Sequence, residues 1–188
     1  MSDRDDADDP FRVTSSRDVY DNPWIHVREH LFTTPSGKEG LYGVVHFKHR
    51  AVGAIPYEDG RIWLVGQRRF TLGAYSWEIP AGGAPEGEDL VETARRELRE
   101  ETGLEAGSIE RIVTMHMSNS VTDELGVVFV ARGLTRGVAS PEDTELLRVV
   151  EAPLDEAYAR VERGEITDSL SVAGIVKLVL MKREGRLD

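Results

Sequence analysis

The sequence has no cysteine among its 188 residues, so it contains neither a disulfide framework nor thiol chemistry. It has no apolar run long enough to span a bilayer, and its N-terminus lacks the pattern of a signal peptide. It also has no internal repeat. These absences favour a cytoplasmic protein that has no membrane partner.

Positive charge is also scarce. Lys and Arg number 23 against 34 Asp and Glu, which gives a net charge of −11. A general nucleic-acid surface would be basic, so this balance argues against a nucleic-acid partner. It does not exclude a phosphorylated substrate, because a bound metal and local arginines can reverse the sign of the charge inside a cleft. Hydrophobic residues make up 40% of the chain, which is enough for one globular domain with a core and a small appendage.

The most informative segment is residues 82–104, which read GGAPEGEDLVETARRELREETGL. Acidic residues follow Gly87, and acids are favoured in the first turn of a helix. Gly103 follows the last periodic residues, as is common for a glycine that ends a helix. The pattern predicts a helix over residues 88–102. On this helix, Glu92 and Arg96 are expected to form an ion pair one turn apart.

Three acidic side chains of this helix are poorly explained as a solvated surface. Glu101 projects within the apolar arc, Glu97 lies at its edge, and Glu100 lies just beyond it. A carboxylate directed toward a core is costly unless it is paired or binds a cation. Mg²⁺ and Mn²⁺ take oxygen ligands, and carboxylates one turn apart can share them, so a divalent metal site is expected here. The apolar arc itself comprises Leu90, Val91, Ala94 and Leu98.

The spacing of Gly82, Glu88 and the run RELREETGL at residues 96–104 resembles a complete Nudix box. The resemblance implies an α+β fold, a Nudix-type α/β/α sandwich with a mixed central sheet and a small N-terminal β segment. It also implies hydrolysis of nucleoside diphosphates linked to another group, with Mg²⁺ as the cofactor and Mn²⁺ as the alternative ion. The metal ligands that it implies are Glu97, Glu100, Glu101 and the backbone carbonyl of Ala81.

The chain is expected to divide into three parts. Residues 1–10 are acidic and almost without apolar side chains, which predicts a disordered tail. Residues 11–48 read as short strands with turns, and residues 49–188 as the Nudix domain, with helices over 153–164 and 168–183. The N-terminal strands resemble those of the ADP-ribose pyrophosphatase branch, where this segment pairs with a second subunit, which implies a homodimer. The alternative is that these strands pack on their own domain.

Two segments before the box resemble substrate-binding parts of the same branch. The sequence QRRF contributes Gln67 and Arg69, and an arginine fork suits a phosphate because it donates paired hydrogen bonds. A solvated basic strand end is the other interpretation of Arg69. The sequence YSWEIPAGG contributes Trp77 and Glu78. Trp77 could either stack on a base or pack in the core.

The catalytic base is expected among four glutamates. Enzymes of the resembled family place one in a loop such as SPEDTE, where Glu142 is the first candidate and Glu145 the second. An acidic surface turn is the other interpretation of that loop. Glu100 and Glu101 of the box are the remaining candidates.

These observations predict a hydrolase that cleaves the pyrophosphate bond of a nucleoside diphosphate sugar, with ADP-ribose as the first expected substrate. Metal ions would neutralise phosphate oxygens and lower the pKa of a bound water, and Arg69 would hold the terminal phosphate. Residues 118–126 lack the proline and aromatic that are common in ADP-ribose enzymes, so GDP-mannose, a dinucleotide or a nucleoside triphosphate stays open. The alternative from another class is a Nudix module that binds a nucleotide metabolite without cleaving it, but such modules usually lose the box acids.

Overall fold

The computed structural model describes residues 10–137 and 146–187, and its internal contacts divide the chain into two units. The first unit comprises Met1–Lys48 together with Met117–Glu124, and the second comprises His49–His116 and Leu125–Asp188. The expected acidic tail, residues 1–10, lies almost entirely outside the described part. The sequence gave no indication that residues 117–124 group with the N-terminal strands.

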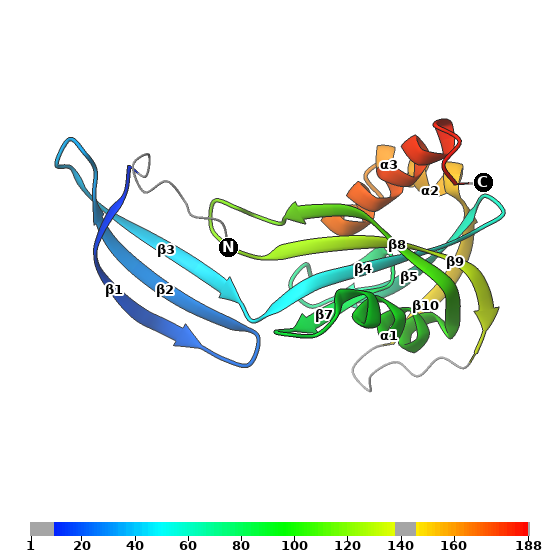
Figure 1. The fold of residues 1–188 in the computed structure, drawn as a ribbon, viewed down its shortest axis with the longest axis horizontal. Helices are drawn as coiled ribbons and strands as arrows, with labels where there is room; N and C mark the ends of the chain where they lie inside the picture. The colour runs from blue at the N-terminus through cyan, green and yellow to red at the C-terminus, as the bar shows by residue number, and fades with distance from the viewer. Residues whose placement is uncertain (1–9, 138–145, 188) are drawn as a thin grey trace. The chain divides into compact units, whose positions relative to one another are not determined.

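The first unit is built on one antiparallel sheet of three strands, in the order β1–β2–β3 (Figure 1). Its strands are β1 (Arg12–Asp21), β2 (Ile25–Thr33) and β3 (Glu39–Phe47). Residues 117–124 run along β3. There, the N–H of Val45 donates to the carbonyl of Val121 at 2.9 Å, and the hydroxyl of Tyr42 donates to the carbonyl of Ser120 at 2.6 Å.

One face of this small sheet carries exposed apolar side chains toward both ends of the β2–β3 pair. Leu31 of β2 lies opposite Leu41 of β3, and their side chains are 48% and 58% exposed. Phe47, opposite Ile25 at the other end of the same two strands, is 37% exposed. Cross-strand partners project to the same face, where the pair Glu29–Gly43 lies between these two apolar areas.

The second unit is organised around a mixed sheet with the strand order β10–β5–β4–β9–β8. Strands β4 and β9 pair in parallel, whereas the other pairs are antiparallel, and the short strands β6 and β7 add to β5 and β4. The strands are β4 (His49–Glu58), β5 (Arg61–Arg69), β6 (Ala74–Glu78), β7 (Ala81–Pro85), β8 (Leu104–His116), β9 (Leu125–Arg136) and β10 (Arg148–Pro153).

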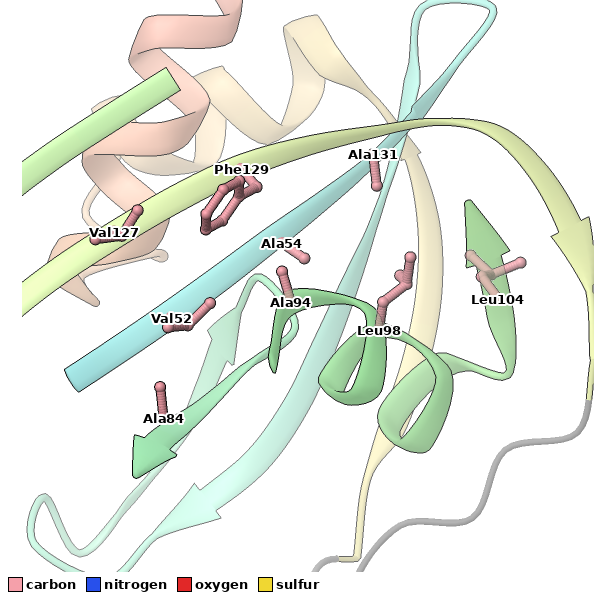
Figure 2. Close-up of a cluster of buried hydrophobic side chains, with 9 residues drawn as sticks. All are labelled: Val52, Ala54, Ala84, Ala94, Leu98, Leu104, Val127, Phe129 and Ala131. Atoms are coloured by element: carbon pink, nitrogen blue, oxygen red, sulfur yellow. The ribbon is translucent and has the colours of Figure 1, made fainter. Parts of the chain in front are cut away.

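Helices cover both faces of this sheet (Figure 1). They are α1 (Leu90–Thr102), α2 (Leu154–Glu162) and α3 (Ser169–Arg183). Strand β4 is apolar without interruption from Val52 to Ile55, and its successive side chains alternate between the two faces. Val52 packs toward α1 in the cluster of Figure 2, whereas Ile55 lies against Gly174 of α3, where an added Cβ would come within 2.7 Å. The predicted α/β/α sandwich with a mixed sheet and an N-terminal β segment is confirmed.

The ends of α1 follow from local sequence. The carboxylate of Asp89 accepts hydrogen bonds from the N–H groups of Val91 and Glu92, so it caps the helix. The predicted start at residue 88 was therefore two residues early. Gly103 ends the helix as expected, with a left-handed backbone (φ 70°) that glycine adopts without strain. No helix in the described residues has the length and apolar character needed to cross a membrane.

Candidate active site

The acidic face of α1 lies against the start of β7. Glu97 and Glu101 are 8% and 3% exposed, and Oε2 of Glu101 accepts a hydrogen bond from the N–H of Ala81 at 3.0 Å. The carboxylate of Glu97 fills the space in which a Cβ on Gly82 would stand. The structure thus brings the two inward-facing acids of the helix to consecutive backbone positions of one strand. The close contact of Glu97 with β7 requires a glycine at position 82.

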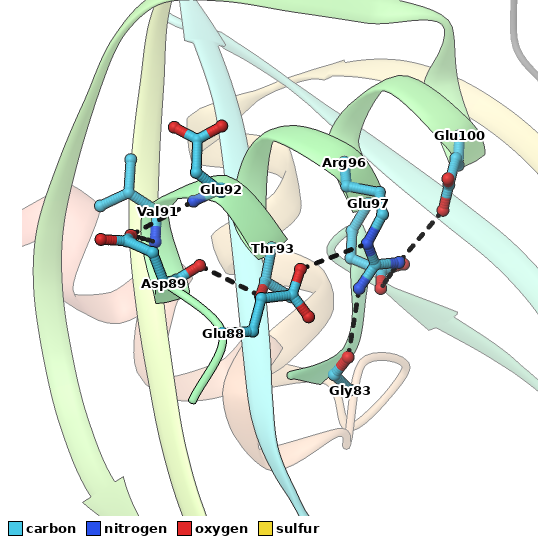
Figure 3. Close-up of polar contacts among 9 residues, drawn as sticks. All are labelled: Gly83, Glu88, Asp89, Val91, Glu92, Thr93, Arg96, Glu97 and Glu100. Atoms are coloured by element: carbon cyan, nitrogen blue, oxygen red, sulfur yellow. Dashed lines mark hydrogen bonds and ion pairs between the residues drawn. The ribbon is translucent and has the colours of Figure 1, made fainter. Parts of the chain in front are cut away.

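Arg96 binds several groups of this face (Figure 3). Its Nη1 donates to Glu97 Oε1 at 2.6 Å and to Glu100 Oε2 at 3.2 Å, and its Nη2 donates to the carbonyl of Gly83 at 3.2 Å. Burial lowers the pKa of Arg96, but Glu97 and then Glu100 outweigh this effect and raise the pKa above its ordinary value. Arg96 therefore supplies positive charge to two of the three carboxylates among the candidate metal ligands.

The predicted pair between Glu92 and Arg96 is wrong. Glu92 lies 3.7 Å from Arg95 Nε, whereas Arg96 turns toward Glu88, Glu97 and Glu100. Sequence reasoning missed this role of Arg96. The available signal was its spacing, because it directly precedes Glu97 and lies one turn before Glu100.

The donor set on α1 and β7 fits a divalent cation. It consists of carboxylates and backbone groups, which are the oxygen ligands that Mg²⁺ and Mn²⁺ prefer. Within residues 10–137 and 146–187, no three His, Asp or Glu side chains converge closely enough to form a preassembled metal site. In the arrangement described, Nη1 of Arg96 lies within hydrogen-bonding distance of both Glu97 and Glu100.

A second cluster forms where β5 pairs with β6. Nε of Arg69 donates to Glu78 Oε1 at 2.9 Å, and its Nη2 also donates to that carboxylate. The hydrogen bond with Glu78 raises the pKa of Arg69, and the charges of Asp168 and Glu101 add to this effect. Glu78 is 4% exposed, and Arg69 is its bidentate partner. Arg69 thus lies in the same electrostatic surroundings as the acidic helix.

The other two predicted substrate residues lie on opposite faces of the β5–β6 hairpin. Gln67 is buried and pairs with Ser76, on the face that carries Arg69 and Glu78. Trp77 lies opposite Gly66 on the other face, where its ring contacts Tyr75 and sits 5.0 Å beneath the guanidinium carbon of Arg160. The structure does not bring Trp77 together with Arg69 and Glu78.

Glu142 and Glu145 lie outside the described residues, so the structure gives no position for either candidate base. The larger cavity described in the second unit, about 340 Å³, is lined by residues such as Trp63, Arg136 and Glu151. None of the predicted site residues that the structure describes lines it. The candidate site therefore rests on the surroundings of α1, β7 and the β5–β6 hairpin.

The layered fold, with carboxylates of one helix turned onto a glycine-rich strand, is here that of a Nudix pyrophosphatase, as the matches to known proteins show. The chain belongs to the Nudix family. Residues 47–170 match the NUDIX domain, and residues 11–45 match the nucleoside diphosphate sugar hydrolase N-terminal domain.

Similar proteins agree with this assignment. An ADP-ribose pyrophosphatase of Mycobacterium tuberculosis (strain ATCC 25618 / H37Rv) is 35% identical over 175 residues, which cover 90% of this chain and 84% of the relative. A methanol dehydrogenase activator of Bacillus methanolicus is 37% identical over 151 residues, which cover 79% of this chain and 81% of the relative. A crystal structure described as an ADP compounds hydrolase superposes with a TM-score of 0.85 and covers 95% of this chain and 98% of that one. Its sequence identity is 20%, so that likeness concerns the fold.

Proposed function

We propose that this Nudix enzyme hydrolyses the pyrophosphate bond of a nucleoside diphosphate sugar, with ADP-ribose as the first substrate. The products are a nucleoside monophosphate and a sugar phosphate. The observation that carries the proposal is the burial of Glu97 and Glu101 against the backbone of Ala81 and Gly82, within a complete Nudix box. The N-terminal domain match and the ADP-ribose pyrophosphatase of Mycobacterium tuberculosis support the choice of substrate.

The proposed cofactor is Mg²⁺, with Mn²⁺ as the alternative. Glu97, Glu100, Glu101 and the carbonyl of Ala81 would hold it, because their oxygens suit hard cations. When bound, such an ion neutralises phosphate oxygens and lowers the pKa of a bound water. The protein's own part is to keep these oxygens turned inward, which the Ala81 N–H does for Glu101 and the space above Gly82 does for Glu97.

Arg69 is the proposed phosphate-binding residue on the substrate side. Its hydrogen bonds to Glu78 use Nε and Nη2, so among the described residues Nη1 is left for a phosphate oxygen. Glu78 fixes the guanidinium plane, and the buried amide of Gln67 lies on the same face of the hairpin. Trp77 is retained as a proposed base contact only from its resemblance, since its side chain lies on the opposite face.

The general base remains assigned to one of four glutamates. Glu100 and Glu101 lie on α1, and Glu142 and Glu145 belong to the loop before β10. Such a residue must lie within hydrogen-bond reach of the attacking water, directly or through another water. We propose Glu142 first, as the sequence does, because Glu101 is already bonded to Ala81 and Glu100 to Arg96.

The proposed assembly is a homodimer formed through residues 11–48. The exposed apolar side chains of Leu31, Leu41 and Phe47 support this proposal, since a single-layer sheet of three strands buries little surface by itself. The division into an N-terminal segment of residues 11–48 and a Nudix domain of residues 49–188, and a cytoplasmic location, also remain proposals.

The deciding experiment is a panel of substrates with product analysis. ADP-ribose, GDP-mannose, a dinucleoside polyphosphate and a nucleoside triphosphate are each incubated with Mg²⁺, with Mn²⁺ or with EDTA. The proposal expects AMP and ribose 5-phosphate from ADP-ribose in the presence of Mg²⁺, and no product with EDTA. Preferred cleavage of another compound would replace the substrate, and absence of any metal-dependent cleavage would favour a non-catalytic binding module.

A further inference from the structure

Ser171 is a polar side chain with no exposed surface, near the start of α3. Its hydroxyl takes part in two hydrogen bonds that link distant parts of the chain. It accepts one from the N–H of Ile79 at 2.9 Å and donates one to Oδ2 of Asp168 at 2.7 Å. A buried amide without a partner is costly, so these bonds explain why a hydroxyl stands in a helix that is otherwise largely apolar on its buried side.

Asp168 does more than cap α3. Its Oδ2 accepts the N–H of Ser171 at 2.8 Å, which is the ordinary bond of a capping residue, and it also receives the Ser171 hydroxyl. The second bond fixes the direction of that hydroxyl, so that its lone pair faces Ile79. The charge of Asp168 also acts on Arg69 of the candidate site. The pKa of Arg69 is raised first by its hydrogen bond to Glu78, and the charge of Asp168 contributes further.

Ile79 lies in the short connection between β6 and β7, and its N–H donates the hydrogen bond that joins this connection to Ser171. Immediately before it, Glu78 binds Arg69. Immediately after it, the carbonyl of Pro80 accepts the N–H of Ala54 at 2.8 Å, and the N–H of Ala81 donates to Glu101. The connection between β6 and β7 is therefore flanked by two residues of the candidate site. Glu78, which binds Arg69, lies at one end, and Ala81, which binds Glu101 of α1, lies at the other.

We propose that Asp168 and Ser171 are positioning residues of the active site. Their hydrogen-bond chain holds the backbone at Ile79, and thereby sets where Glu78 meets Arg69 and where Ala81 meets Glu101. The proposal rests on the proposed function, because it concerns the geometry in which that reaction takes place. Neither residue is required to contact the substrate.

The first test compares two substitutions in α3. Ser171→Ala removes the hydroxyl at the centre of this hydrogen-bond chain. Val179→Ala is the matched control, since it removes buried side-chain atoms two turns further along the same helix. We expect Ser171→Ala to lower kcat about tenfold or more while KM changes less than about threefold, because small displacements of reacting groups are costly. Val179→Ala is expected to lower thermal stability but not kcat at a temperature where the protein is folded. Equal kcat values for the two variants would overturn the proposal.

Asp168 provides a second test, in which a conservative substitution should preserve activity. Asp168→Asn keeps a side-chain oxygen that can cap the helix and receive the hydroxyl, and Asn caps helices about as well as Asp. It should retain most of kcat, whereas Asp168→Ala should lose about as much as Ser171→Ala. Because the two residues act as one chain, the double alanine variant should lose no more than either single variant. Multiplying losses in the double variant would show that the two residues act separately.

A readout without substrate separates this proposal from the proposed function. Amide hydrogen exchange of Ile79 and Ala81 is measured by NMR in the unmodified protein, in Ser171→Ala and in Val179→Ala. We expect exchange at both amides to become about tenfold faster in Ser171→Ala only, because the connection opens locally. Unchanged exchange at Ala81 would overturn the positioning role, whichever substrate the enzyme cleaves. Failure of the whole substrate panel would instead overturn the proposed function.

Discussion

Glu101 combines two roles that one substitution can separate. Its charge is part of the proposed metal site, and its Oε2 accepts the N–H of Ala81. In Glu101→Gln the amide oxygen can still accept that hydrogen bond, but the negative charge is lost. We expect turnover to fall about 100-fold or more, while the thermal unfolding midpoint does not fall. Retained turnover at saturating Mg²⁺ would contradict the role in metal binding.

Gly82 gives a test of the close contact between β7 and α1. A Cβ on Gly82 would overlap the Glu97 carboxylate, whereas one on Gly83 would stand 3.1 Å from Nδ1 of His49, a side chain that can shift. Gly82→Ala should therefore displace Glu97, lower kcat/KM and raise the Mg²⁺ concentration needed for half-maximal activity. Gly83→Ala is the matched control and should change both quantities little. Similar titration curves for the two variants would contradict the assignment of Glu97.

The candidate bases Glu142 and Glu145, which precede β10 in the sequence, are tested by a comparison of two substitutions. If Glu142 is the general base, Glu142→Gln should lower kcat more than Glu145→Gln, because general-base catalysis contributes about 100-fold or more. Single-turnover rates across a range of pH would separate loss of the base from slower product release. An unchanged rate in Glu142→Gln would move the base to α1 or to Glu145.

At the scale of elements, residues 117–124 form a loop whose attachment to β3 includes the carboxylate of Asp123 beside the bonds from Val45 and Tyr42. Asp123 Oδ2 lies 2.7 Å from Nδ1 of His46, and its Oδ1 accepts the N–H of Phe47 at 3.0 Å. Burial alone raises the pKa of Asp123, but the bonds with His46 and Phe47 outweigh it and hold this pKa below its ordinary value. The charged form is therefore the one that attaches the loop.

The sign of this shift predicts an acid-sensitive loop. A carboxylate whose pKa is lower in the folded state stabilises that state fully above its unfolded pKa of about 3.9, and loses this effect as the pH falls through the folded value. Amide hydrogen exchange in residues 117–124, corrected for the intrinsic effect of pH, should become faster below about pH 4. Asp123→Asn keeps an acceptor but does not titrate, so its exchange should lack this acid-dependent step. The same step in both proteins would assign it to another group.

At the scale of the whole molecule, the apolar face of the three-stranded sheet predicts the state of assembly. If Leu31 and Leu41 are covered by a second copy, sedimentation should give a dimer, and Leu41→Asp should shift it to a monomer because a buried charge is costly. Leu180→Asp is the control, since Leu180 is a 45% exposed leucine on α3 of the other unit. A monomer before any substitution, or equal dissociation of both variants, would contradict the proposed interface.

Much of the fold could be predicted from short-range patterns. Gly103 indicated the end of α1, and the predicted helix over residues 168–183 corresponds to α3. The start of α1 was misplaced because Glu88 and Asp89 both suit a first turn, and only the backbone shows that Asp89 is the cap. The grouping of residues 117–124 with β3 could not be predicted, because it depends on contacts such as that of Tyr42 with Ser120, far apart in the sequence.

The candidate site, like the fold, could be predicted in part from local sequence patterns. Spacing along one helix placed Glu97 and Glu101 on the inward face, because side chains one turn apart share a face whatever surrounds them. Spacing did not reveal that Arg96 would turn toward Glu97 and Glu100, since that depends on where the strand beside the helix leaves room. It also could not indicate that Trp77 points away from Arg69, because this depends on the register of β6 against β5.

The sequence by itself determined the family, the acidic helix and the type of chemistry, because these depend on residue types at fixed local spacing. The tertiary structure decided which residues support that chemistry. Ser171 bonds to Ile79 across 92 positions of sequence, and no local pattern encodes such a contact. It exists only because packing brings the start of α3 against the connection between β6 and β7, where a buried N–H needs an acceptor.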